Sequence, residues 1–212
     1  MSFSTSPHAP ESLDVLAALR DATGSRHALI DSSMPLSADA PTLTDYCLHL
    51  QLIAAWLAPL EAWLAHFDDG PQRALSFVAR MPLIVRDLDE AALRHLGAPA
   101  FETQRDATPL PAADAAYRWG VCYVIEGSQL GGTVLYRRLR DSLAPHPLRY
   151  LSGDGVPPGP RWKHFIEAMR TQVVTVHDIA RACEGAQAAF DRLLALLPAA
   201  GTLAGAGTLE AS

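Results

Sequence analysis

The sequence GVCYVIEGSQLGG, residues 120–132, decides how the middle of this chain folds, because three of its last six residues are glycines. Each glycine in a helix interior costs about 1 kcal/mol relative to alanine. Taken alone, VCYVI at 121–125 would also suit a short buried strand. The helical pattern around it runs from about 112 to 142, however, and that length favours a helix. We therefore predict a long central helix that accepts glycines for a reason other than its own stability.

The same helical spacing of apolar residues continues on both sides of this segment. The other predicted helices are 11–33, 42–67, 71–80, 86–97, 161–184 and 185–197. Thr42 is placed to cap the second of these, and Pro59 should kink or divide it. No stretch alternates convincingly as a strand, and the chain has no internal repeat. The sequence predicts an all-α fold: a single-domain bundle of about seven or eight helices.

The chain ends differ in composition from this helical domain. Residues 1–10 are rich in Ser and Pro, and we expect a disordered segment there. The helical domain is expected to span 11–197, with loops at 107–111 and 152–160. The Ala- and Gly-rich stretch 198–212 is expected to be a flexible tail.

Composition and charge argue against several classes of function. A net charge of -6 offers no basic surface, which disfavours a nucleic-acid partner. The three cysteines lie far apart, so neither a disulfide framework nor a zinc site is indicated. The N-terminus lacks the features of a signal peptide. The most apolar run, LQLIAAWLAPLEAWLAHF, is interrupted by polar residues and a proline, which argues against a membrane span. We predict a cytoplasmic protein with no membrane partner.

A stripe of polar residues lies in LRDATGSRHALID, residues 19–31. Arg20 and His27 are seven residues apart and fall within about 20° of one another around a helix. Thr23 and Asp31 each lie four residues from His27, on the same stripe. A carboxylate one turn from a histidine is the usual means of orienting a metal-ligating imidazole. The spacing fits an ordinary amphipathic-helix histidine equally well.

The glycines of the central helix also share a face, because Gly127 and Gly131 are four residues apart and Gly132 lies beside them. Missing side chains let a helix backbone approach a flat ligand closely. They also suit close helix–helix packing, and glycine content does not separate the two. If the His27 helix and the glycine helix face each other, they enclose a space for a planar macrocycle whose metal takes one axial imidazole. Heme is the obvious candidate.

Two motifs together resemble the bacterial heme oxygenase family: LRxxTxxxH at 19–27 and YVxEGSxLGG at 123–132. A later aromatic pattern, Tyr150 followed by GPRWKHF at 159–165, is similar too. The resemblance covers about 11–197, and the most similar subgroup is the one associated with bacteriophytochromes.

The resemblance implies roles for particular residues. His27 would ligate the heme iron, with Asp31 as the carboxylate near that ligand and Arg20 near the heme propionates. The distal-helix glycines that lie against the heme would be Gly127, Gly131 and Gly132.

One position departs from the animal-type heme oxygenases, which carry an aspartate on the distal helix where this chain has Ser128. Bacterial members with EGS at this point resemble this chain and are regarded as enzymes. The resemblance then implies that oxygen activation depends on backbone groups near Gly127 and Gly131 and on ordered water, with Ser128 assisting. Glu126 adjoins the motif, and we expect a structural role for it on the helix face.

Basic residues near the motif have two interpretations. Arg161 and Lys163 could meet the propionates or an electron donor, and the alternative is a solvated helix face. The cluster Arg137, Arg138 and Arg140 could dock an acidic donor such as ferredoxin, although charge runs are usually only solvated.

The family resemblance implies an enzyme that cleaves heme to biliverdin, carbon monoxide and iron. Heme would be both substrate and cofactor, and O2 and electrons from a ferredoxin or a reductase would be required. The subgroup resemblance implies a bacteriophytochrome as recipient of the biliverdin. Two alternatives remain open: a non-catalytic heme-binding or heme-trafficking protein on the same fold, and an unrelated helical bundle with another small ligand.

Overall fold

The computed structural model describes residues 14–96 and 114–206, with side chains described up to residue 197. Within these ranges the chain is helical and contains no strand, which confirms the all-α prediction. The α-helices are α1 (Val15–Ser33), α2 (Leu43–Leu64), α3 (Pro71–Ala74), α4 (Met81–Leu88), α5 (Ala91–Arg94), α6 (Ala115–Leu139), α7 (Arg149–Ser152), α8 (Pro158–Gln172) and α9 (Val176–Ala206). Two 3-10 turns, η1 (Pro35–Ser37) and η2 (Gly153–Gly155), complete the described elements.

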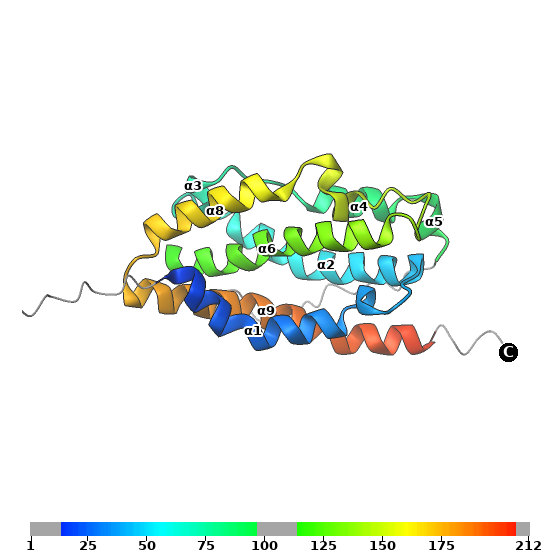
Figure 1. Cartoon of the computed structure of the whole chain (residues 1–212), viewed down its shortest axis with the longest axis horizontal. Coiled ribbons are helices and arrows are strands. Elements are labelled where there is room, and N and C mark those ends of the chain that lie inside the picture. Colours follow the sequence, from blue (N-terminus) through cyan, green and yellow to red (C-terminus); the bar gives the residue numbers. More distant parts are fainter. Residues whose placement is uncertain (1–13, 97–113, 207–212) are drawn as a thin grey trace, which may run out of the picture.

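Helix α6, which carries the glycine motif, runs through the middle of the bundle (Figure 1). It packs on α9 along much of its length, and α9 also supports α1 and α2. Helix α8 and the short α7 lie against the upper side of α6, while α1 runs below it. The motif helix is therefore packed against α9, α8 and α7, while α1 and α2 pack on α9.

Local sequence explains where the long helices begin. Asp14 caps α1 by accepting a hydrogen bond from the Leu16 amide. Thr42 and Asp45 form the reciprocal capping box of α2, which confirms the predicted start. Asp114 caps α6 by accepting from the Tyr117 amide at 2.8 Å.

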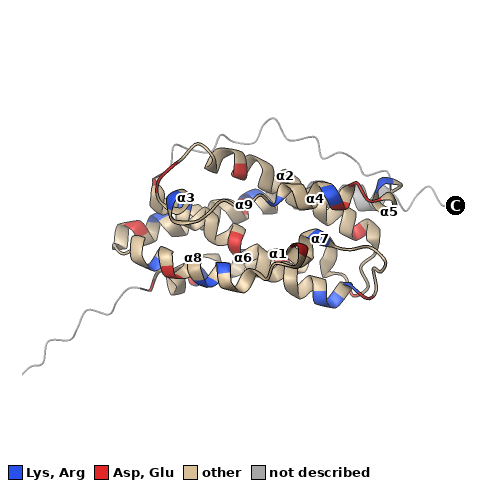
Figure 2. Ribbon diagram, turned by 90° about the horizontal axis from the view of Figure 1, so that it is seen from above, with Lys and Arg blue, Asp and Glu red and all other residues tan. Residues whose placement is uncertain are grey.

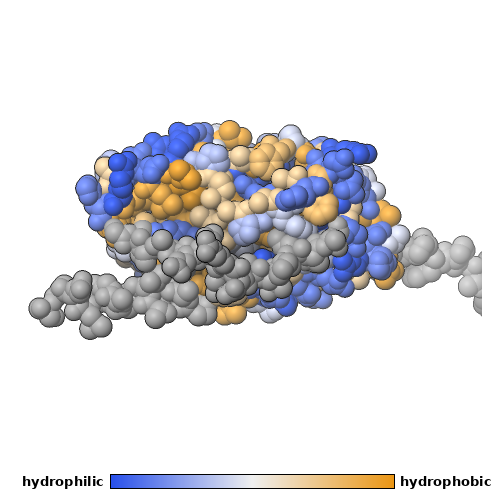
Figure 3. Space-filling view, turned by 180° about the vertical axis from the view of Figure 1, so that it is seen from behind, coloured by the Kyte–Doolittle hydropathy of each residue, from blue (hydrophilic) through white to orange (hydrophobic). Residues whose placement is uncertain are grey.

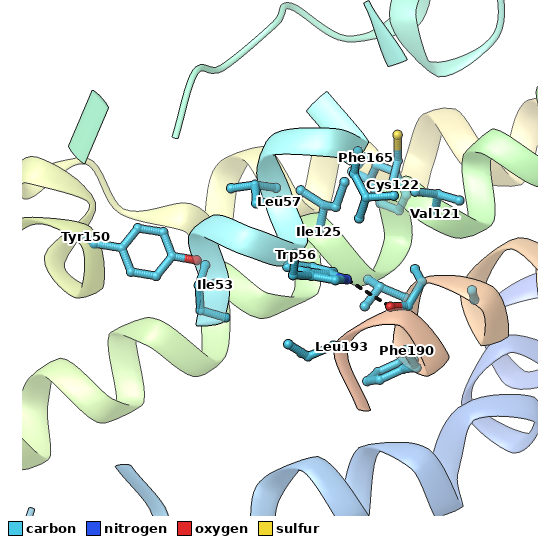
Figure 4. Close-up of a cluster of buried hydrophobic side chains, with 14 of the residues drawn as sticks. Ile53, Trp56, Leu57, Val121, Cys122, Ile125, Tyr150, Phe165, Phe190 and Leu193 are labelled. Carbon is cyan, nitrogen blue, oxygen red and sulfur yellow. Dashed lines mark hydrogen bonds between the residues drawn. The ribbon is translucent and has the colours of Figure 1, made fainter. Parts of the chain in front are cut away.

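Pro59 does not divide α2 as predicted, because the helix is continuous from Leu43 to Leu64. Its buried side chains pack into the core on both sides of the proline, and such packing outweighs local propensity. Figure 4 shows part of this core, in which the Trp56 indole donates to the Ala189 carbonyl of α9 at 2.9 Å.

The predicted break between 161–184 and 185–197 was wrong. The two helices are instead separated at residues 173–175, and Gly185 lies inside α9. A Cβ at Gly185 would lie 2.0 Å from the Tyr117 carbonyl oxygen, and a Cβ at Gly120 would lie 1.8 Å from the Ala182 carbonyl oxygen. These two glycines let α6 and α9 cross closely, a packing role that the sequence analysis did not assign to Gly120.

Other boundaries also differ from the prediction. The predicted helix 71–80 is only α3, because the chain then leaves the helix and brings Arg80 to α6. The predicted helix 86–97 is replaced by the separate pieces α4 and α5. Helix α9 continues to Ala206, past the predicted end at 197 and into the stretch 198–212 that we expected to be a flexible tail. The predicted disordered segment 1–10 and loop 107–111 lie outside the described residues.

Charge is mixed over the described surface, where acidic and basic residues are interspersed along the helices (Figure 2). Seen from behind, apolar residues form a band between more hydrophilic ends (Figure 3). Helix α2 is long and apolar enough to cross a membrane, so its polar interruptions do not exclude a span by themselves. Half of its most apolar window is buried inside the protein, as in a core helix.

Candidate functional site

His27 projects from α1 with its side chain 63% exposed. Its Nδ1 lies 2.8 Å from Asp31 Oδ2, as the spacing of the two residues predicts. On the inner side the imidazole faces the Phe190 ring of α9, with 6.0 Å between the ring centroids. The contact with Asp31 fixes the ring and directs Nε2 away from the carboxylate, which is how a metal-ligating histidine is prepared.

Helix α6 approaches α1 and the turn after it at two places. Burial raises the pKa of Tyr123, one turn before Gly127, and the nearby guanidinium of Arg20 on α1 partly opposes this rise. Near the other end of α6, the guanidinium of Arg138 donates to the Leu36 carbonyl, just beyond the end of α1. These approaches connect α6 with α1 and with the turn that follows it, and we call the region between the two helices the slot.

The glycines of the motif have different surroundings. A Cβ at Gly131 would meet no described atom within 4 Å, and the same holds for Gly24 of α1, three residues before His27. A Cβ at Gly127 would meet only the Trp162 ring, at 3.7 Å, and one at Gly132 would meet Leu151, at 3.7 Å or more. Gly131 and Gly24 are both exposed, so no described side chain covers the backbone of α6 or of α1 at these two positions, and a flat ligand requires such uncovered backbone.

Ser128 lies on the flank of the stripe and is half-buried. Its Oγ donates to the Ile125 carbonyl at 2.8 Å and accepts from Gln129 Nε2 at 3.2 Å. Gln129 Nε2 also donates to the Tyr150 hydroxyl at 3.3 Å. Burial raises the pKa of Tyr150, so its hydroxyl stays protonated beside Ser128.

A model of the heme oxygenase family, described as "Heme oxygenase", matches residues 13–198 of the chain. The chain belongs to the heme oxygenase family. A relative named heme oxygenase, from Xanthomonas campestris pv. campestris (strain 8004), is 36% identical over 146 residues, which are 67% of this chain and 79% of that protein. The chain is thus a heme oxygenase, an enzyme of heme degradation.

A solved structure also shows the fold. The NO- and CO-bound heme oxygenase from Neisseria meningitidis superposes with a TM-score of 0.61 at 22% sequence identity, covering 89% of this chain and 92% of that one. The residues that border the slot fit heme, because Gly131 and Gly24 admit a flat ring and His27 presents an imidazole held by Asp31.

Arg161 does not join the His27 group of this heme oxygenase. Its guanidinium makes two 2.8 Å hydrogen bonds to the Glu126 carboxylate and a third to the Ser76 carbonyl. Glu126 is only 7% exposed and also pairs with Arg80 at 2.7 Å. Burial raises the pKa of Glu126, but the hydrogen bonds and charges of Arg161 and Arg80 outweigh it and hold the pKa below its ordinary value. A buried carboxylate needs such compensation, so the predicted propionate contact of Arg161 is corrected to an internal ion pair.

The remaining basic residues lie at the surface. Lys163 is 79% exposed and lies 3.9 Å from Glu167 on the same helix. Arg137 and Arg140 line an open groove of about 820 Å³ between α6 and the loop before α8, whereas Arg138 is turned to the Leu36 carbonyl. Sequence reasoning missed Arg80, because the loop that carries it had been predicted as helix.

Alanine substitutions at Gly131 and at Gly120 test whether the slot is open at Gly131. Gly131→Ala should raise the stability of the heme-free protein by about 0.5–1 kcal/mol, because helix propensity improves and the methyl group meets nothing. The same methyl group should weaken hemin binding. Gly120→Ala should lower stability by about 1–3 kcal/mol or more, since α6 and α9 must separate. Urea unfolding of the heme-free variants measures the two stability changes, and hemin titration measures the change in binding. A destabilised Gly131→Ala protein would contradict an open slot.

Proposed function

We propose that this heme oxygenase binds heme in the slot with His27 as the axial ligand of the iron, and cleaves the ring to biliverdin, carbon monoxide and iron. The observation that carries the proposal is the pairing of His27 Nδ1 with Asp31, on the helix that faces the open stripe at Gly131. Bound heme supplies the iron at which O2 is activated and the ring that is oxidised, with electrons from an external donor.

The protein's own residues hold and orient this substrate. Asp31 accepts the Nδ1 proton, which fixes the tautomer in which Nε2 is the ligand atom. Arg20 carries a positive charge at one end of the slot and can meet a propionate there. Gly131 leaves the far side of the ring accessible to a small ligand. Ser128, Gln129 and Tyr150 form a hydrogen-bonded group on the flank of the stripe, from which water can be held and protons supplied.

Removal of the orienting carboxylate should be costly. We expect Asp31→Ala to lower hemin affinity by about 10–100-fold, because the imidazole loses its fixed tautomer and orientation. Hemin titration followed by absorbance measures the affinity. Asp39→Ala, a change of the same kind at an exposed position beyond η1, is the matched control. Equal affinities for the two variants would exclude a role for Asp31.

The second candidate function is heme binding or trafficking without turnover. It is favoured by Ser128, which replaces the aspartate of animal-type enzymes and whose hydroxyl is bonded to the Ile125 carbonyl. One experiment distinguishes the two functions. The protein is mixed with one equivalent of hemin in the presence of O2, and electrons are supplied either by ascorbate or by a ferredoxin and its reductase. An oxygenase converts the heme spectrum to a bilin band and releases carbon monoxide and chelatable iron. A carrier leaves the heme intact with both electron sources.

The proposal extends to partners. Arg137 and Arg140, at the edge of the open groove, offer positive charge to an acidic electron donor such as ferredoxin or a reductase. We propose a cytoplasmic setting and, through the subgroup resemblance, a bacteriophytochrome that receives the biliverdin.

A further inference from the structure

The indole of Trp162, on α8, covers one part of the glycine stripe. Its ring carbons lie 3.7 Å from the Cβ position of Gly127, and its centroid lies 5.6 Å from that of Tyr123. Tyr123 in turn lies near enough to Arg20 of α1 for the guanidinium charge to act on its hydroxyl, so Trp162 lies toward the Arg20 end of the slot. Four residues further along α6, the stripe is open at Gly131. The stripe is therefore covered at one end and free at the other.

A ring contact of the indole and two ion pairs of its helix hold it in place. It stacks on Phe165, with 5.6 Å between the ring centroids and 16° between the planes, and Phe165 is completely buried. The residue before Trp162, Arg161, is joined by two hydrogen bonds to the residue before Gly127, Glu126. Helix α8 is also tied to the start of α1, because Arg170 pairs with Asp14 at 3.2 Å. A side chain fixed by stacking and by an adjacent ion pair acts as a rigid wall, since moving it would disturb a close-packed core.

The wall has a consequence for the reaction, on the basis of the proposed function. A heme held by one axial imidazole can rotate about the bond between the iron and Nε2. This rotation stops where the edge of the heme meets a rigid side chain. The angle at which it stops determines which bridging carbon of the ring is oxidised. We infer that Trp162 is a specificity-determining residue of this heme oxygenase: its indole sets the rotation of the heme and thereby the bridging carbon that is cleaved.

The chain offers graded variants for a test. Trp162→Phe keeps an aromatic ring but replaces the indole with a smaller side chain, and Trp162→Ala removes the aromatic ring. Trp63→Phe, a comparable change on α2, lies beside Tyr117 and Phe67 and serves as the control. The first readout is the ratio of biliverdin isomers, separated by chromatography after turnover of hemin. The second is the pattern of heme-methyl proton shifts in the ferric cyanide complex, which reports the rotation of the ring without turnover.

We expect one dominant isomer and one dominant methyl pattern from the unchanged protein and from Trp63→Phe. In Trp162→Ala the ratio of the main isomer to the others should fall about tenfold or more, since the loss of even one well-packed apolar group changes discrimination by that amount. A second methyl pattern should appear in parallel, and Trp162→Phe should be intermediate. An unchanged ratio and methyl pattern in Trp162→Ala would overturn the inference, as would a mixture from the unchanged protein. If no biliverdin forms in any sample, the proposed function fails, while the methyl shifts still decide whether Trp162 sets the rotation.

Discussion

Glu126→Gln should lower the free energy of unfolding by about 3–5 kcal/mol, the cost of removing one partner from a buried ion pair. The carboxylate is the only acidic group that the described contacts give to both Arg80 and Arg161. A neutral amide removes the carboxylate that pairs directly with the Arg80 guanidinium, which is 7% exposed. Urea unfolding of the heme-free protein measures the change.

The same substitution should change how stability depends on pH. Because the pKa of Glu126 is lower in the folded protein than in the unfolded chain, its contribution is fully present above about pH 4.5, the ordinary value. It is lost as the pH falls toward and through the lower folded value. The difference between the two proteins should therefore shrink below about pH 4.5. Glu167→Gln, which alters only an exposed pair with Lys163, should change stability by about 0.5 kcal/mol or less. A similar small effect for Glu126→Gln would contradict the structural role of the ion pair.

His27→Ala should reduce hemin affinity by more than the roughly 10–100-fold that loss of a carboxylate hydrogen-bonded to the ligand costs, because it removes the proposed ligand itself. The side chain is exposed on α1 and its contacts are with Asp31 and the Phe190 ring, so the apoprotein should keep its stability. Added imidazole can enter the space left by the side chain and should restore part of the binding. Hemin titrations with and without imidazole measure both effects.

His164→Ala serves as the control, because His164 is an exposed histidine on α8. It should bind hemin as the unchanged protein does. If His27→Ala binds hemin with unchanged affinity and an unchanged spectrum, another residue ligates the iron.

The helical class of this protein could be predicted from periodicity, because long amphipathic and apolar helices leave a regular pattern. The ends of helices were less predictable. Gly185 has the propensity of a helix terminator, yet it lies inside α9 because α6 crosses there, and such a crossing is not visible in local sequence. Similarly, packing on both sides of Pro59 keeps α2 continuous.

In the site, too, some contacts could be predicted from the sequence and others could not. The spacing of His27 and Asp31 on one helix predicted their contact, since residues four apart meet on a helix surface. The glycines could not be separated in sequence, and the structure shows that Gly120 serves packing while Gly131 faces open space. Arg161 pairs with Glu126, and a loop brings Arg80 to the same carboxylate from 46 positions away. No local sequence pattern encodes contacts between residues so far apart in the chain.

The most direct test of the central claim is a crystal structure of the hemin complex, with diffraction measured at the iron absorption edge to locate the metal. The account predicts a single iron within coordination distance of His27 Nε2, with the ring lying between α1 and α6 and the Gly131 backbone on its opposite side. An iron bound by another residue, or a ring outside the slot, would contradict it.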